Sequence, residues 1–216
     1  MTHLTGTGPR QLASLVCPAP ESPLVEAFLV STGIVALAEI GDKTQLLAFL
    51  LAARFRKPWP IVLGIFIATV VNHAGAGYVG TLVAQWLTPE VLRWVLGLGF
   101  LAMAAWILVP DEVDDDEASS AGRWGVLGTT IVAFFLAEMG DKTQIATVAL
   151  AARFHDFVWV VAGTTLGMML ANVPAVFIGH KAATALPVKW VHRTAALVFA
   201  VLGVATLVGA GARWGF

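Results

Sequence analysis

The chain has 216 residues, of which 58% are hydrophobic and 12% are charged, whereas soluble domains contain about 45–50% apolar and about 25% charged residues. A soluble protein of this length cannot bury so much apolar surface, so the composition excludes a soluble fold and indicates a protein of the lipid bilayer. The net charge of −1 gives no sign of a nucleic-acid partner, and the single cysteine, Cys17, excludes a disulfide framework and a cysteine-based metal site.

The N-terminal residues contain several prolines and glycines and lack the long apolar core of a signal peptide, so we predict a disordered tail at 1–23. Beyond it, the chain is divided into apolar stretches that can span a bilayer, which takes about 20 residues. Charged residues interrupt two of these stretches. Because each part alone is too short to cross the membrane, we predict one continuous helix through each interruption. The six predicted transmembrane helices lie near residues 26–53, 58–86, 91–109, 124–152, 157–180 and 191–212.

Between the third and fourth predicted helices the chain is almost entirely acidic from Asp111 to Glu117. A solvated linker at 111–123 accounts for this run. The alternative is a weak cation collector, although such a run offers no fixed cage for an ion. Lys and Arg residues are more frequent in the predicted loops on the linker's side, which the positive-inside rule places in the cytoplasm. We therefore expect an integral protein of a bacterial-type inner membrane, with a cytoplasmic linker and both termini outside.

The sequence contains an internal repeat with a shift of 99 residues. Leu37–Phe55 aligns with Leu136–Phe154 without a gap, and 13 of the 19 positions are identical. Each copy holds three predicted helices, and this odd number means that the second copy enters the membrane from the opposite side. The pattern predicts an all-α integral membrane protein with six transmembrane helices in two inverted three-helix repeats, at 24–110 and 124–216, as in many secondary transporters.

Both copies carry the motif Glu-x-Gly-Asp-Lys-Thr-Gln near the middle of a predicted helix. A charged residue at the bilayer centre costs at least about 2.5–3.5 kcal/mol, so such residues usually mark ion or proton pathways. At helical spacing the three charged residues of one motif share a face, and inversion of the repeats brings the two motifs together near the midplane. We predict that four carboxylates bind a divalent cation: Glu39, Asp42, Glu138 and Asp141. The remaining motif residues are expected to support them: Gly41, Lys43, Thr44, Gln45, Gly140, Lys142, Thr143 and Gln144.

The charges of the two motifs suit an exchanger. Four carboxylates and two lysines carry a net charge of −2, which either one divalent cation or two protons neutralise. Oxygen ligands are hard, so they favour Ca²⁺, Mn²⁺ or Mg²⁺ over Zn²⁺ or Cu⁺. The structural alternative is an ion-pair network that joins the halves, for example through a Glu39–Lys43 pair and a contact of Asp42 with the other repeat. Buried ion pairs, however, stabilise proteins only weakly compared with apolar replacements, which favours a functional site.

Three further polar residues, Asn72, His73 and Asn172, lie mid-span in the second and fifth predicted helices. Hydrogen bonds between helices are their simplest role. The alternative is that they line the cation site, with His73 as a proton carrier. Histidines at the predicted membrane edges are expected to be solvated: His155, His180 and His192.

The two copies of Glu-x-Gly-Asp-Lys-Thr, at 39–44 and 138–143, resemble the signature of the Gdt family of cation/proton exchangers. That family includes Golgi manganese/calcium transporters and bacterial manganese exporters, and the likeness extends over nearly the whole chain beyond the N-terminal tail. The resemblance implies that Mn²⁺ or Ca²⁺ leaves the cytoplasm, or enters an organelle, in exchange for protons. It implies roles for the motif residues but not for His73 or Asn172.

Two other functions fit the same residues less well. A divalent cation channel would use the same ligands but would not need titratable carboxylates in inverted repeats. An intramembrane aspartyl protease could use the two Gly-Asp pairs, yet it leaves the adjacent Glu and Lys residues unexplained. The favoured prediction is a transporter and not an enzyme, whose partners are a divalent metal ion, protons and the lipid bilayer, without a prosthetic group or a nucleic acid. The sequence carries no signal for an oligomeric state.

Overall fold

A computed structural model of the chain describes residues 23–109, 125–178 and 188–209, which contain eight α-helices and no β-strand. The all-helical class is therefore confirmed. The predicted acidic linker and the N-terminal tail up to residue 22 lie outside the described residues. The helices are α2 (Pro23–Glu39), α3 (Lys43–Phe55), α4 (Pro58–Trp86), α5 (Pro89–Trp106), α6 (Gly125–Glu138), α7 (Lys142–Phe154), α8 (Phe157–Ile178) and α10 (Val188–Leu207).

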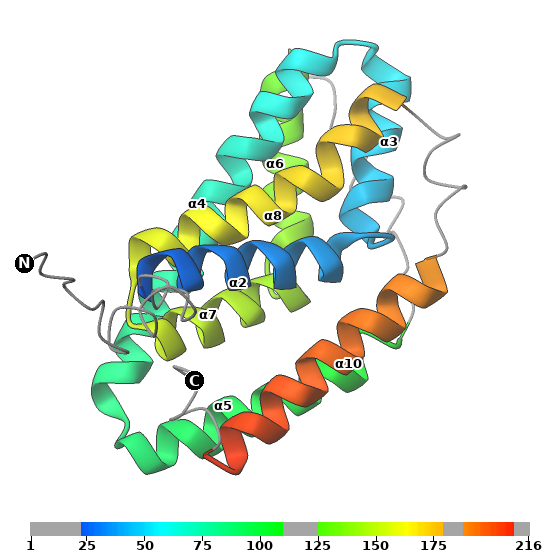
Figure 1. The fold of residues 1–216 in the computed structure, drawn as a ribbon. Helices are drawn as coiled ribbons and strands as arrows, with labels where there is room; N and C mark the ends of the chain where they lie inside the picture. Colours follow the sequence, from blue (N-terminus) through cyan, green and yellow to red (C-terminus); the bar gives the residue numbers. More distant parts are fainter. Residues whose placement is uncertain (1–22, 110–124, 179–187, 210–216) are drawn as a thin grey trace, which may run out of the picture.

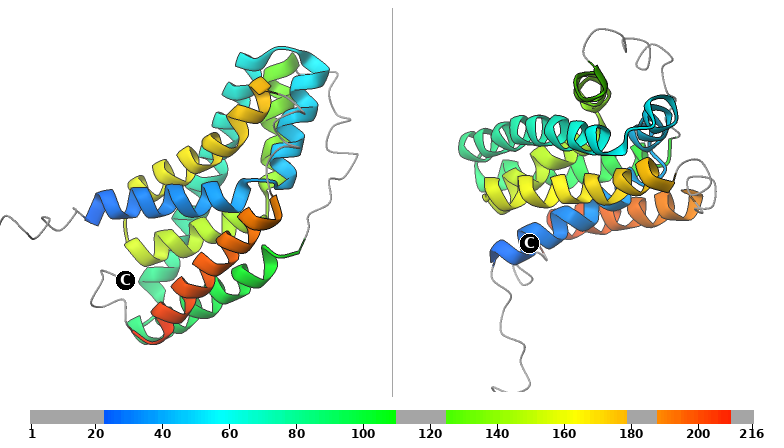
Figure 2. Two further views of the ribbon diagram at one scale, coloured as in Figure 1. Left: turned by 45° about the vertical axis from the view of Figure 1, so that its right-hand side comes forward. Right: turned by 90° about the horizontal axis from the view of Figure 1, so that it is seen from above.

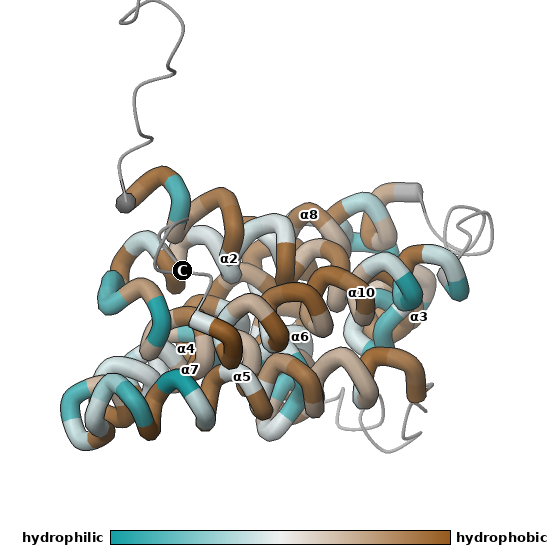
Figure 3. Tube along the Cα trace, turned by 60° about the horizontal axis from the view of Figure 1, so that its bottom comes forward, coloured by the Kyte–Doolittle hydropathy of each residue, from teal (hydrophilic) through white to brown (hydrophobic). Residues whose placement is uncertain are grey.

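Several helices are long and apolar enough to cross a membrane. In the described parts of the chain three pass this test alone, within α4, α8 and α10, and a fourth candidate is α2 together with α3, which are bent by 70° at the break between them. Helix α6 is apolar but shorter. Apolar residues predominate along the helices in Figure 3, and large apolar side chains such as Leu98 (55% exposed) remain on the surface. The protein is therefore a membrane protein; six spans remain a prediction.

Each motif interrupts its helix, and the prediction of two continuous helices near 26–53 and 124–152 is wrong. The first is divided into α2 and α3, and the second into α6 and α7. The cause is the glycine of the motif: Gly41 has a φ of 86° and Gly140 a φ of 78°, in the left-handed region that glycine adopts without a steric penalty. The next residue, Asp42 or Asp141, is extended with a ψ of 168° or 167°. The regular helical hydrogen-bond ladder therefore stops in each motif.

The two halves of the chain pack by exchanging partners (Figures 1 and 2). Helix α2 of the first half packs mainly on α8 of the second, and its repeat equivalent α6 packs mainly on α4 of the first. Glycines permit both contacts: a Cβ on Gly163 of α8 would meet the Phe28 backbone of α2, and one on Gly64 of α4 would meet Thr130 of α6. The halves are thus interlocked rather than separate.

The apolar core has two clusters, and the helix breaks lie where they meet. One cluster joins α2, α5, α7 and α10 with a contribution from α8, and the other joins α3, α4, α6 and α8. Helices α5 and α10 lie side by side, with the rings of Phe100 and Phe199 6.1 Å apart. Because α2 and α7 belong to the first cluster and α3 and α6 to the second, the chain passes between the clusters at each break. Polar groups at the breaks are therefore enclosed by apolar packing.

Candidate cation site

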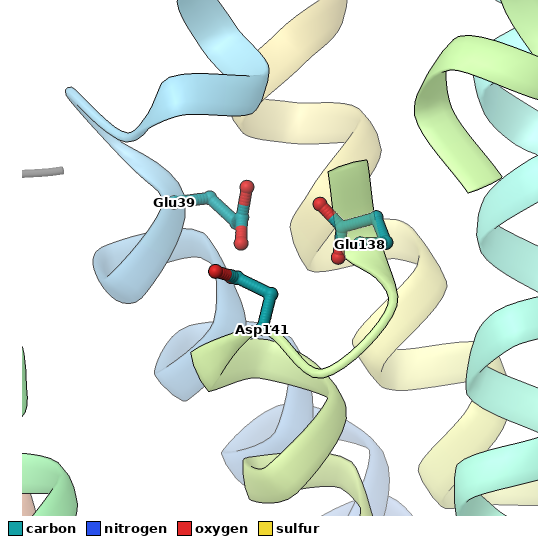
Figure 4. A group of neighbouring side chains, drawn as sticks. All are labelled: Glu39, Glu138 and Asp141. Carbon is teal, nitrogen blue, oxygen red and sulfur yellow. The ribbon is translucent and has the colours of Figure 1, made fainter. Parts of the chain in front are cut away.

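The breaks bring acidic side chains from both halves together. Glu39 ends α2, Glu138 ends α6, and Asp141 precedes α7. Each offers one carboxylate oxygen, and these oxygens lie within 4.8 Å of one another (Figure 4). All three residues are buried, the two glutamates completely. Three of the four predicted carboxylate ligands thus form one group, and Asp42 is not part of it.

The two lysines form ion pairs that cross between the halves. The Lys142 Nζ lies 3.0 Å from the Asp42 Oδ1, and the Lys43 Nζ lies 3.4 Å from the Asp141 Oδ1. Each lysine is therefore paired with the aspartate of the other motif copy, and a contact of Asp42 with the other repeat is part of the structural alternative that the sequence allowed. Because each aspartate has a cationic partner, the net charge of −2 resides formally on the two glutamates.

One oxygen of each glutamate is held by a threonine of its own motif. The Thr44 hydroxyl donates to the Glu39 Oε2 at 2.5 Å, and the Thr143 hydroxyl donates to the Glu138 Oε2 at 2.9 Å. The other oxygen, Oε1 in both cases, is buried without a hydrogen-bond partner among the residues that the structure describes. A buried polar atom of this kind is costly, and carboxylate oxygens are the ligands that hard divalent cations prefer. The two glutamates fit a cation bound between them.

The glutamines hold the backbone at the breaks. The Gln45 Oε1 accepts a hydrogen bond from the Gly41 amide at 3.0 Å, and the Gln144 Oε1 accepts one from the Gly140 amide at 2.7 Å. Gln45 also donates through Nε2 to the Ala171 carbonyl in α8 at 2.8 Å. These side chains satisfy amides that have left the helical ladder, so they fix the position of the neighbouring carboxylates.

Four helix ends meet at the group. Helices α2 and α6 end at it with the partial negative charge of a carboxyl end, and α3 and α7 begin beside it, at Asp42 and Asp141, with the partial positive charge of an amino end. Broken membrane helices whose carboxyl ends meet in this way provide cation sites in other transporters. An anionic glutamate at a helix carboxyl end is repelled by the partial negative charge there. A cation or a proton between Glu39 and Glu138 relieves this repulsion and the repulsion between the two carboxylates.

The polar residues of α4 and α8 make contacts of their own. Asn72 donates to the Phe135 carbonyl of α6 at 3.1 Å, which is a bond between helices. Asn172 donates to the Met168 carbonyl within α8 at 3.1 Å. His73 is completely buried, and neither of its ring nitrogens has a hydrogen-bond partner within the described chain. Asn72 therefore makes a hydrogen bond between helices, as its simplest expected role requires, while a proton-carrying role for His73 stays a prediction.

No feature of the sequence connects His192 with the motifs. It was expected to be solvated at a membrane edge, but it is half-buried near the start of α10, and its Nε2 lies 3.0 Å from the Ile40 carbonyl in the first break. The repeat equivalent of His192 is Arg93, a different residue type, so the internal alignment contained no signal for this contact. His180 lies outside the described residues.

Comparison with known proteins agrees with the duplicated motif. The chain matches the family described as Divalent cation/proton antiporter GDT1 over residues 27–115 and 126–214, one stretch in each half. A Vibrio cholerae protein named "Putative manganese exporter" is 48% identical over 194 residues, which cover 89% of this chain and 96% of that protein. A Synechocystis GDT1-like protein is 28% identical, covering 84% and 96%. The Saccharomyces cerevisiae protein "Divalent cation/proton antiporter GDT1" is 22% identical, covering 83% and 82%. No solved structure matches.

Proposed function

The chain belongs to the GDT1 family of divalent cation/proton antiporters, and on that premise we propose that it exports Mn²⁺, or alternatively Ca²⁺, from the cytoplasm in exchange for protons. Membership makes it a membrane transporter of divalent cations and not an enzyme. The metal ion is the transported substrate. The proposal concerns the direction of transport, the exchange for protons and the residues that carry it.

The observation that carries the proposal is the state of the two central glutamates. Lys43 and Lys142 compensate Asp141 and Asp42 across the halves, which leaves Glu39 and Glu138 with two uncompensated negative charges and one unpartnered oxygen each. One divalent cation neutralises this pair, and so do two protons. The two substrates therefore compete for the same oxygens. A site that holds neither of them leaves two buried negative charges uncompensated, which is unfavourable. This competition couples metal movement in one direction to proton movement in the other.

Asp141 supplies a third oxygen to the group. Its partner Lys43 is at 3.4 Å, longer than the 3.0 Å of the other cross-pair, so Asp141 is the aspartate better placed to turn from a lysine to a metal ion. In this proposal Asp42 takes the same role when the two halves exchange conformations. Thr44 and Thr143 orient the glutamates throughout.

Alternating access between inverted repeats is the mechanism that we propose for the exchange. The reciprocal packing of α2 on α8 and of α6 on α4 is the pattern that two inverted repeats at 24–110 and 124–216 require. Motifs from both halves then share one central site that each half can open to one side of the membrane. The charge distribution of the loops orients the acidic linker toward the cytoplasm and the termini outside.

A proteoliposome assay tests this function. A pH gradient is imposed in the absence of an inward metal gradient. We then expect Mn²⁺ to accumulate against its own gradient in exchange for protons. The same assay with Mn²⁺, Ca²⁺ and Mg²⁺ ranks these ions as substrates. Glu39→Gln and Glu138→Gln should reduce accumulation to the protein-free background. Glu90→Gln, the same change at an exposed position at the start of α5, is the matched control. Metal flux that only follows its own gradient would indicate a channel and contradict exchange.

A further inference from the structure

The two motif breaks have almost the same sequence but unequal exposure. In the first break Ile40 and Gly41 are half-buried, whereas in the second Met139 is 55% exposed and Gly140 is also exposed. The cross-pairs are also unequal. Side-chain exposure is 1% for both Lys142 and Asp42, whereas in the pair that involves the second break it is 22% for Lys43 and 3% for Asp141.

Helix α10 lies against the first break. It packs against α2, and its residue His192 lies beside the first break, with Nε2 3.0 Å from the Ile40 carbonyl. A carbonyl oxygen only accepts hydrogen bonds, so the imidazole N–H donates. In Figure 1 the beginning of α10 lies near the junction of α2 and α3.

Among the described residues, the second break has no equivalent contact. Arg93 of α5 is the repeat equivalent of His192, and it lines a cavity of about 660 Å³ together with Arg153 and His155, which lie at the far end of α7. Helix α5 packs on α7 and α10. The third helices of the two halves therefore approach the site differently, and α10 alone of the two covers a motif break.

The unequal exposure of the two breaks matters because the protein lies in lipid. Non-helical backbone at membrane depth is tolerated only where it is buried in protein or lines water, because lipid offers its N–H and C=O groups no hydrogen bonds. At the first break, His192 satisfies the Ile40 carbonyl. At the second break the amides are satisfied, that of Gly140 by Gln144, but the Met139 and Gly140 carbonyls accept no hydrogen bond from the described residues, and both residues reach the surface. For these carbonyls to be satisfied in a bilayer, this segment must face water.

We propose that, in the conformation described here, the cation reaches the carboxylates from the side of Met139 and Gly140, and that His192 is a positioning residue through which α10 closes the opposite side at Ile40. Lys43, partly exposed beside Asp141, lies at this entrance. The inference rests on the proposed function, since an entrance is needed only by a transported substrate. It goes further by assigning the open side and the residue that holds the other side closed.

Cysteine accessibility tests the entrance without measuring transport. In a Cys17→Ser background, Met139→Cys and Ile40→Cys place one thiol at equivalent positions of the two breaks. Proteoliposomes permeabilised to the cationic thiol reagent MTSET expose both sides to it, and the reagent modifies only thiolates in water. Because a minor conformation is populated at roughly 10% or less, Met139→Cys should react at least about tenfold faster than Ile40→Cys. Equal rates, a faster reaction at Ile40→Cys, or an unreactive Met139→Cys would overturn the proposal.

The role of His192 has its own test in the Ile40→Cys background. Adding His192→Ala should accelerate labelling, whereas His192→Gln, whose side-chain amide can still donate to the carbonyl, should keep it slow. Arg93→Ala, at the equivalent position of the other repeat, is the control and should leave the rate unchanged. Unchanged labelling in His192→Ala would exclude the closing role. If labelling follows these expectations in a protein that moves no metal, the transport proposal fails, and what stands is only the unequal water exposure of the two breaks and its dependence on His192.

Discussion

The α2–α3 and α6–α7 breaks have closely similar backbones, whereas α5 and α10, the third helices of the two halves, have different surroundings. The motif glycines have φ values of 86° and 78°, and the same Thr–Glu and Gln–Gly bonds recur in both copies. Helix α10 instead packs on α2, while α5 packs on α7. Each motif completes the other through the crossed ion pairs, so neither can change shape alone. The third helices meet the core through apolar side chains, which permit different positions.

The largest expected difference lies within the motif pair itself, between the two lysines. Lys142→Met leaves Asp42 charged and sealed from solvent, with a side-chain exposure of 1%, and breaking a buried pair costs about 3–5 kcal/mol of unfolding free energy. Lys43→Met likewise leaves a buried aspartate, Asp141, which is 3% exposed, but Lys43 itself is 22% exposed, so solvent screens this pair in part and the loss should be the smaller of the two. Thermal unfolding in detergent measures both losses.

A double variant separates the cost of the unpaired charge from the loss of the lysine itself. Lys142→Met with Asp42→Asn removes the uncompensated carboxylate, so most of the stability lost in Lys142→Met should return. Similar losses in Lys142→Met and Lys43→Met would show that the two pairs are equivalent, and the contrast between the closed and the open side would fail.

The second prediction compares the interlocked core with the α5–α10 pair. A Cβ at Gly80 in α4 would collide with the Val148 backbone carbonyl of α7, which is fixed by its helix, so Gly80→Ala should cost about 1–3 kcal/mol. A Cβ at Gly97 in α5 would collide first with the Leu207 side chain of α10, which can shift. Gly97→Ala should therefore destabilise the protein less. Unfolding midpoints of the two variants measure the difference, and a larger loss at Gly97 would contradict a yielding α5–α10 contact.

Much of the fold and of the site could be predicted because the sequence encodes them locally. Apolar length predicted the helices, and intramembrane charges predicted that acids from both motifs would meet. The break was missed although a signal was present. Glycine is the usual residue after a helix end and aspartate a preferred residue before a helix start, so Gly41-Asp42 marks the end of one helix and the start of the next. The length of about 20 residues that a membrane span needs favoured one continuous helix instead.

Other features could not be predicted because they depend on contacts between distant segments. The sequence allowed a contact of Asp42 with the other repeat, but the crossing of both lysines, Lys142 to Asp42 and Lys43 to Asp141, follows from how the two halves interlock. The contact of His192 with Ile40 depends on where α10 lies, and no periodicity in the sequence specifies that position. Asymmetry between the repeats is invisible to an alignment that compares the halves only with each other.

The smallest predicted effect concerns the backbone of the break and has an internal control of opposite sign. Gly140 has a φ of 78°, and a Cβ there meets nothing within 4 Å, so Gly140→Ala carries only the conformational cost of a left-handed residue, about 1–2 kcal/mol. Gly33 in the middle of α2 also has nothing within 4 Å of a Cβ, but it is helical, and Gly33→Ala should stabilise the protein by about 0.5–1 kcal/mol. Unfolding midpoints in detergent should therefore move in opposite directions. If both variants are stabilised, the second break can relax into a continuous helix, and the left-handed glycine is not what separates α6 from α7.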